Sequence, residues 1–171
     1  MTALWLKPLP QNSVLNRIFV ILLAAITLVS CDSSVVYSDY QDLSDNLEWR
    51  RTDVRSFEIE VAENLTPYEH QLIFRHATGY PYSHILLRIT EVQPNGDVVT
   101  RDERILVRDE AGKFEGKADG DLVDITYILD KSRNFKSWGK YKFTVEHTMP
   151  RDTVHLALEV GMVLRKLSAE K

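Results

Sequence analysis

Apolar and polar residues alternate along much of the chain after residue 55, which is the pattern of half-buried β-strands. The clearest case is the segment 140–146, in which Tyr141, Phe143 and Val145 alternate with charged and polar residues. Similar alternation occurs in the segments 56–61, 123–129 and 154–164. The apolar segments Leu72–Phe74 and Ile85–Val92 predict strands that are more fully buried. Beyond residue 30, no stretch has a convincing apolar stripe at the 3.6-residue helical period.

Turn signals separate these predicted strands. Asn95-Gly96 lies between the apolar segments 85–92 and 98–107, and Asn-Gly is a strong indicator of a β-hairpin. Gly/Asp turns follow at Asp109–Gly112 and Ala118–Asp121. Short strands joined by such turns predict an all-β fold, an antiparallel β-sandwich of about seven to eight strands. Neither an internal repeat nor a second folded domain is indicated.

The N-terminal region has the pattern of an export signal. An apolar run of twelve residues, Ile18–Val29, follows Lys7 and Arg17, with no acidic residue before it. The run is shorter than the roughly 20 residues of a membrane-spanning helix. A buried helix followed by a structural cysteine is the alternative. The terminal position, the order of charges and the single cysteine favour a cleaved signal peptide.

Leu28-Val29-Ser30-Cys31 resembles a bacterial lipobox. That resemblance implies cleavage before Cys31, lipidation of its sulfur, and a membrane-anchored lipoprotein of the cell envelope. Residues 1–30 are then the signal peptide, residues 31–50 the lipidated N-terminus and a polar tether, and residues 51–171 the β-sandwich. Scattered apolar residues in 35–40 suggest that part of the tether docks as a short strand. The membrane and leaflet that hold the lipid stay open.

Composition excludes several classes of function. Removing residues 1–30 leaves 141 of the 171 residues, enough for one domain with a sizeable core. It also removes Lys7 and Arg17, which takes the formal net charge from −4 to −6 and argues against nucleic acid as a partner. Cys31 is the single cysteine, so the domain has no disulfide, thiolate metal site or cysteine nucleophile.

Candidate catalytic and metal-binding patterns are weak. The five histidines show no spacing typical of metal ligation, and no Ser/His/Asp set stands out, so we expect no enzyme, metal or cofactor. Calcium prefers acidic oxygens like those of Asp119, Asp121 and Asp124, but the EF-hand pattern is absent and a Gly/Asp turn beside a strand explains these residues without an ion. Asp102 and Glu103 are adjacent on a predicted strand and therefore point to opposite faces, which argues against a paired-carboxylate hydrolase.

Three aromatic residues near predicted loops are candidates for contact with a ligand. Tyr80, Tyr82 and Trp138 could stack on a sugar or a protein partner. The alternative is that these rings fill the core or pack against turns, which is the commoner role of such residues.

Several segments, taken in order, resemble the gliding motility lipoprotein family GldH of the Bacteroidetes. The resemblance rests on Cys31–Ser33, Val36-Tyr37, Asp39–Gln41, Thr66–Tyr68, Leu72–Arg75, Tyr80–Ser83 with Leu86, Pro94–Gly96, Gly112-Lys113, Gly120–Leu122, Gly139–Phe143, Glu146–Met149 and Val160–Met162. It implies a lipid-anchored, non-enzymatic envelope component linked to gliding and type IX secretion, with protein partners in that apparatus. Members also occur in bacteria that do not glide, so a role in envelope assembly or surface-protein export stays open. The alternative function is a glycan-binding envelope module.

Overall fold

The computed structural model describes residues 34–62 and 66–167, and these residues form eleven strands and no helix. In chain order the strands are β1 (Val35–Asp42), β2 (Glu48–Arg50), β3 (Arg55–Val61), β4 (Tyr68–Ala77), β5 (His84–Val92), β6 (Val98–Leu106), β7 (Lys117–Asp119), β8 (Leu122–Arg133), β9 (Gly139–His147), β10 (Thr153–His155) and β11 (Ala157–Lys166). Three of them, β2, β7 and β10, have three residues each. The other eight correspond in number to the predicted seven to eight strands.

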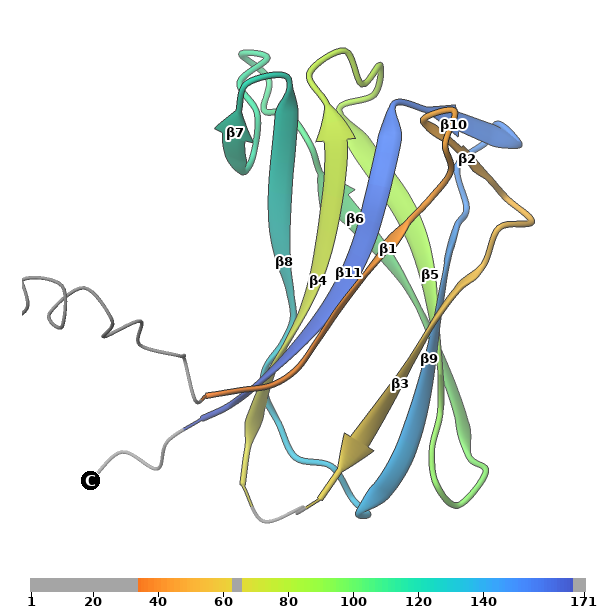
Figure 1. Ribbon diagram of the computed structural model, residues 1–171, viewed down its shortest axis with the longest axis vertical. Helices are drawn as coiled ribbons and strands as arrows, with labels where there is room; N and C mark the ends of the chain where they lie inside the picture. The colour runs from red at the N-terminus through yellow and green to blue at the C-terminus, as the bar shows by residue number, and fades with distance from the viewer. Residues whose placement is uncertain (1–33, 63–65, 168–171) are drawn as a thin grey trace, which may run out of the picture. The chain divides into compact units, whose positions relative to one another are not determined.

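All strand pairings are antiparallel, which confirms the predicted fold class. One sheet has the order β1-β11-β4-β8-β7 and the other has the order β3-β9-β5-β6. The two sheets lie face to face, and a short β10-β2 ribbon lies at one end of the sandwich (Figure 1). Antiparallel sheets packed in this way bury one face of each strand in a common core.

The core forms from the residues that the alternation predicts. Phe57 and Ile59 of β3 and Tyr141 and Phe143 of β9 are at most 1% exposed, while the residues between them face solvent. From the opposite sheet, Phe74 of β4 packs into the same cluster. Burial of these side chains supplies most of the free energy that holds the two sheets together.

The predicted hairpin at Asn95-Gly96 joins β5 and β6. The Gly96 N–H donates to the Gln93 carbonyl at 2.9 Å, and Gly96 has a φ of 87°, a conformation that glycine adopts without strain. β6 is an edge strand of its sheet and carries charges of both signs. Charged edges of this kind hinder pairing with a strand of another molecule.

The prediction of one long strand through Val154–Leu164 is wrong. Leu156 has a φ of 62° and ends β10, which pairs with β2, before β11 starts at Ala157. The Leu156 N–H donates to the carbonyl of Leu47, just before β2, and the Leu156 carbonyl accepts from the N–H of Ala77 at the end of β4. These two bonds connect the β10-β2 ribbon to the five-stranded sheet at Leu156. The pairing of β11 with β4 then shifts register by one residue between Ala157 and Glu159, which changes the face to which the following side chains point.

The first strand lies inside the segment for which the sequence predicts a tether. β1 begins at Val35 and pairs with β11 along its length, and Tyr37 packs against the core. The Gln41 side-chain amide donates to the Ser56 carbonyl of β3 at 2.8 Å, which connects the two sheets on this side. The predicted signal peptide, 1–30, lies outside the described residues.

Candidate functional site

The three aromatic candidates do not come together. Tyr80 and Tyr82 lie between β4 and β5, whereas Trp138 lies between β8 and β9, at the opposite end of the sandwich (Figure 1). Tyr80 is 1% exposed and meets Phe74 edge to face, with ring centroids 5.6 Å apart. Tyr82 is partly buried against Tyr80, and Trp138 is 74% exposed.

Burial of Tyr80 leaves no ring face for a sugar or a partner, and its position matches the alternative prediction, that the ring fills the core. Trp138 is the one of the three that presents a large aromatic surface to solvent. Cys31, the predicted lipidation site, lies outside the described residues.

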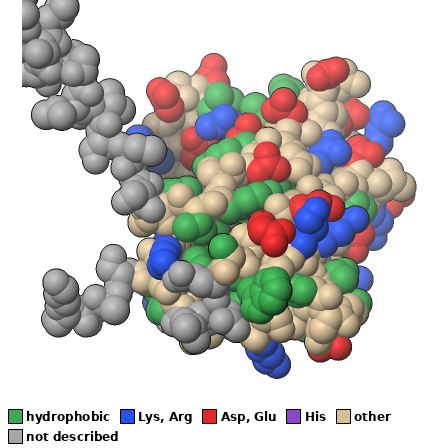
Figure 2. Space-filling model, turned by 60° about the horizontal axis from the view of Figure 1, so that its bottom comes forward, with side chains coloured by type: hydrophobic (Ala, Val, Ile, Leu, Met, Phe, Trp, Pro, Cys, Tyr) green, Lys and Arg blue, Asp and Glu red, His purple; other side chains and the backbone are tan. Residues whose placement is uncertain are grey.

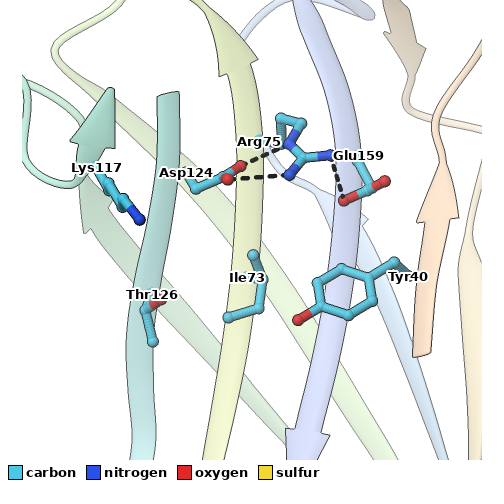
Figure 3. Close-up of a pocket in the computed structure, with 7 residues that line it drawn as sticks. All are labelled: Tyr40, Ile73, Arg75, Lys117, Asp124, Thr126 and Glu159. Atoms are coloured by element: carbon cyan, nitrogen blue, oxygen red, sulfur yellow. Dashed lines mark hydrogen bonds and ion pairs between the residues drawn. The ribbon is translucent and has the colours of Figure 1, made fainter. Parts of the chain in front are cut away.

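A cavity of about 500 Å³ lies on the outer face of the five-stranded sheet (Figure 3). It is lined by Tyr40, Ile73, Arg75, Lys117, Asp124, Thr126 and Glu159, and we call these residues the outer-sheet groove. They come from β1, β4, β7, β8 and β11, so antiparallel pairing of strands far apart in the sequence assembles them.

The register arranges the groove as two rows across the sheet. In the first row, Tyr40 pairs with Gly161, Gly161 with Ile73, and Ile73 with Thr126. In the second row the partners are, in order, Asp42, Glu159, Arg75, Asp124 and Lys117. Side chains opposite one another on neighbouring strands are within contact distance, so an aromatic and apolar row runs beside a charged row.

Arg75 is the centre of the charged row. Its Nε and Nη2 atoms donate to the two carboxylate oxygens of Asp124 at 2.6 and 2.9 Å, and its Nη1 lies 3.4 Å from Oε1 of Glu159 (Figure 3). The bidentate hydrogen bond from Arg75 holds the pKa of Asp124 below its usual value. Burial, partly offset by the charge of Arg75, raises the pKa of Glu159.

Both groove carboxylates are thus committed to the same guanidinium group. A general acid and a general base need carboxyl groups that are free to exchange protons with a substrate, and this pair is held by Arg75 instead. The groove offers fixed hydrogen-bonding groups, the Lys117 ammonium group, and the ring of Tyr40, which is 48% exposed. This chemistry suits recognition of a polar ligand or a protein surface.

A second charged cluster lies where β8 meets the four-stranded sheet. Asp130 is 3.3 Å from Arg101 and 3.5 Å from Arg133, and its Oδ2 lies 3.7 Å from Nδ1 of the buried His70. Arg133 also donates to Glu91. The adjacent His70 ring and the charges of both arginines hold the pKa of Asp130 far below its usual range, while burial lowers the pKa of His70.

This cluster joins the two sheets, since Arg101 and Glu91 belong to β6 and β5 and the other charges to β4 and β8. A register shift near His70 and Leu129 rotates Asp130 toward His70. Simple alternation from Asp124 predicts that Asp130 points to the outer face, so the sequence gives no signal for this cluster. Its charges satisfy one another, which makes it a structural connection between the sheets.

The remaining acidic candidates are separated or paired. Asp102 accepts two hydrogen bonds from Arg88 on the outer face, and Glu103 accepts one from the Tyr127 hydroxyl group at 2.8 Å. The two carboxylates therefore point to opposite faces, as predicted. In residues 34–62 and 66–167, no group of three or more His, Cys, Asp or Glu side chains is placed to hold a metal ion. A helix of sufficient length and hydrophobicity to cross a bilayer is also absent from that part of the chain.

The GldH lipoprotein family matches residues 35–164, from the first residue of β1 into β11. The chain is 25% identical over 136 residues to a gliding motility lipoprotein GldH homolog of Christiangramia forsetii, a match that covers 79% of this chain and 82% of that protein. It is 24% identical over 130 residues to the gliding motility lipoprotein GldH of Flavobacterium johnsoniae, covering 76% of this chain and 79% of the relative.

Among solved structures, a family GH115 4-O-methyl-alpha-glucuronidase is similar over 81% of this chain and 18% of its own. The sequence identity is 8% and the TM-score is 0.41, too low to support a conclusion about function. The family match spans the sandwich from β1 to Leu164 of β11, and both relatives match over most of their own length. The chain belongs to the GldH lipoprotein family.

Proposed function

We propose that this protein is a lipid-anchored, non-enzymatic component of the cell envelope that serves gliding motility, type IX secretion or envelope assembly by docking on protein partners. The anchor is an acyl modification of Cys31, and the docking domain is the β-sandwich. The observation that carries the proposal is the family match from residue 35 to residue 164, which covers all eleven strands except the last two residues of β11.

The groove supports docking over catalysis. Arg75 is paired with both Asp124 and Glu159, so the outer-sheet groove presents a fixed pattern of charge without a free acid–base pair. It lies on paired strands of a sheet, and the backbone of such an interface usually moves little on binding. Such a pattern matches a partner surface with complementary charges. It contributes mainly to the specificity and the orientation of binding, and less to the affinity.

The proposal is tested by crosslinking intact cells, solubilising the envelope gently, and purifying the tagged full-length protein for mass spectrometry. Recovery of motility or type IX components with the wild-type protein, and their loss with Cys31→Ala, is the expected result. A Cys31→Ala protein that stays uncleaved or unlipidated and yet supports full function would contradict the anchoring role.

The same experiment locates the docking face. Thr126→Arg places a large charged side chain inside the groove. The control, Thr100→Arg, introduces the same side chain outside the groove, at an exposed position of β6 in the other sheet. We expect partner recovery to fall with Thr126→Arg and to persist with Thr100→Arg. Equal partner recovery with both variants would show that the docking surface lies outside the groove.

Glycan binding is the second candidate, and Tyr40 is the observation that favours it. Its half-exposed ring lines the same groove as the polar side chains of Arg75 and Thr126, a combination suited to a sugar ring. Glycan arrays test this, with loss of binding expected for Tyr40→Ala and unchanged binding for Tyr82→Ala and Trp138→Ala. Absence of any glycan signal with the wild-type protein would remove this candidate.

A further inference from the structure

The connection between the predicted lipidation site and the fold is very short. β1 begins at Val35, four residues after Cys31. An extended chain spans at most about 3.6 Å per residue, so Cys31 lies within about 14 Å of the start of β1. If Cys31 carries the lipid, as proposed above, the sandwich end that contains Val35 stays close to the bilayer surface.

The register identifies that end. Val35 pairs with Arg165 of β11, the adjacent Lys166 pairs with Tyr68 of β4, and Tyr68 pairs with Arg133 of β8. Beyond this row the chain continues into the β8–β9 connection, residues 134–138. The β5–β6 hairpin lies at the same end of the sandwich (Figure 1). These two connections are therefore on the lipid-proximal side of the domain.

The β8–β9 connection holds Trp138 outward on a fixed support. Phe135 fills the core below it and is 3% exposed, with its ring centroid 4.7 Å from that of Tyr141. The Tyr141 hydroxyl donates to the Ser137 carbonyl at 2.9 Å and accepts from the Ser137 N–H at 3.2 Å. Both backbone groups of the residue before Trp138 are thus fixed.

Gly139, the residue after Trp138, lies close to the β5–β6 hairpin. Gly139 has a φ of 121°, and a Cβ atom there would lie 3.3 Å from the ring of Pro94 in the β5–β6 hairpin. The backbone on both sides of Trp138 therefore has defined neighbours, Tyr141 on one side and Pro94 on the other. Val98, at the end of the hairpin, is 62% exposed. Figure 2 turns this end toward the viewer and shows hydrophobic side chains exposed between acidic and basic ones.

We propose that the β8–β9 connection is a membrane-contact surface, with Trp138 inserted at the interface of the bilayer that holds the lipid of Cys31. Tryptophan is enriched at the boundary between lipid and water, where its ring is partly buried and its N–H group stays hydrated. The short connection to Cys31 and the position of Trp138 beyond the Val35 row favour the bilayer over a soluble partner. The opposite end of the sandwich then faces away from the membrane.

Fluorescence quenching tests this orientation. The full-length protein is purified from membranes, acylation of Cys31 is verified by mass spectrometry, and the protein is reconstituted in phosphatidylcholine vesicles with or without brominated acyl chains. After signal-peptide removal the chain has two tryptophans, the buried Trp49 and Trp138. We expect brominated lipid to remove most of the Trp138 emission, measured as the difference between wild type and Trp138→Phe.

A matched reporter tests the opposite end. In the Trp138→Phe background, Leu122→Trp places an indole at the start of β8, where the native leucine is 37% exposed. We expect that indole to keep its emission in brominated vesicles. Unquenched Trp138, or equal quenching of both positions, would overturn the membrane contact while leaving the anchor intact. Absence of acyl chains on Cys31 would overturn the proposed anchoring, and the membrane contact with it.

Discussion

The side chain of Tyr40 occupies the space above Gly161 that any other residue at position 161 would need. Tyr40 on β1 and Gly161 on β11 are cross-strand partners, and a Cβ atom on Gly161 would lie 2.5 Å from Cδ1 of the tyrosine ring. Figure 3 shows the ring lying over β11 at the edge of the groove. The absence of a side chain on Gly161 is thus what lets an aromatic ring lie flat against the outer sheet.

Gly161→Val is expected to displace the tyrosine ring and to lower the free energy of unfolding by about 1–3 kcal/mol, as overpacking does. The same substitution in a Tyr40→Ala background loses less stability, because the ring that it displaces is already gone. Urea denaturation of the four proteins gives the coupling energy, expected to exceed about 0.5 kcal/mol. Additive effects would show that the ring and the valine do not compete for space.

Arg75→Met leaves Asp124 and Glu159 facing each other without the guanidinium group between them. The side chains of the Arg75–Asp124 ion pair are about one-third exposed, so solvent screening limits the expected loss of stability to about 1 kcal/mol. Arg88→Met is the matched control, since Arg88 makes a bidentate contact with Asp102 at 2.8 and 2.9 Å on a more exposed surface. Denaturation curves that give equal losses for both variants would contradict a special role of the groove pair.

Stability is expected to fall as the pH is lowered through the range just below 6.5. Burial lowers the pKa of His70, His76 and His147 in the folded protein, so the unfolded chain binds protons first. The contribution of each histidine is complete above its unfolded pKa and is lost as the pH falls toward its folded pKa. Within that range the free energy of unfolding changes by about 1.4 kcal/mol per pH unit for each histidine.

Urea denaturation at several pH values between about 7.5 and 5 measures this slope. His76→Phe keeps an aromatic ring between Phe74, Tyr80 and Phe114, and we expect it to reduce the slope. His155→Gln is the control, because the His155 side chain is 62% exposed. A slope that is unchanged in His76→Phe would assign the pH dependence to other groups.

Tyr141→Phe removes the hydroxyl group that fixes both backbone groups of Ser137. We expect a loss of about 1–2 kcal/mol in the free energy of unfolding, because the Ser137 groups are partly buried and lose their partner. Amide hydrogen exchange at Ser137 is expected to quicken more than exchange in the centre of β9. Unchanged exchange at Ser137 would show that Phe135 alone orders the connection.

The sequence predicts the core of this fold well, because alternation is a local property. Phe57 and Ile59, and likewise Tyr141 and Phe143, are two residues apart and face the same side of any strand. The hairpin at Asn95-Gly96 is equally local, since turn chemistry is contained in adjacent residues. Leu156 breaks the pattern because its left-handed backbone is imposed by contacts with Leu47 and Ala77, far away in the sequence.

The outer-sheet groove could not be predicted in the same way. Tyr40, Arg75 and Asp124 become neighbours only when β1, β11, β4 and β8 pair in one particular register, and the alternation of each strand leaves that register undetermined. Tyr80 shows the converse problem, since its position between two strands suggests exposure while the fold buries it against Phe74. Strand order and register were the missing information in both cases.

The position of β1 determines how the domain bears mechanical load. β1 is an edge strand joined to the sheet through β11, and its first residue is the one nearest to the predicted anchor. A pull between the lipid and the far end of the sandwich acts along the strand, while the hydrogen bonds to β11 lie across it. Such a pull loads the bonds along β1 together in shear, and the strand resists far more force than one peeled away bond by bond.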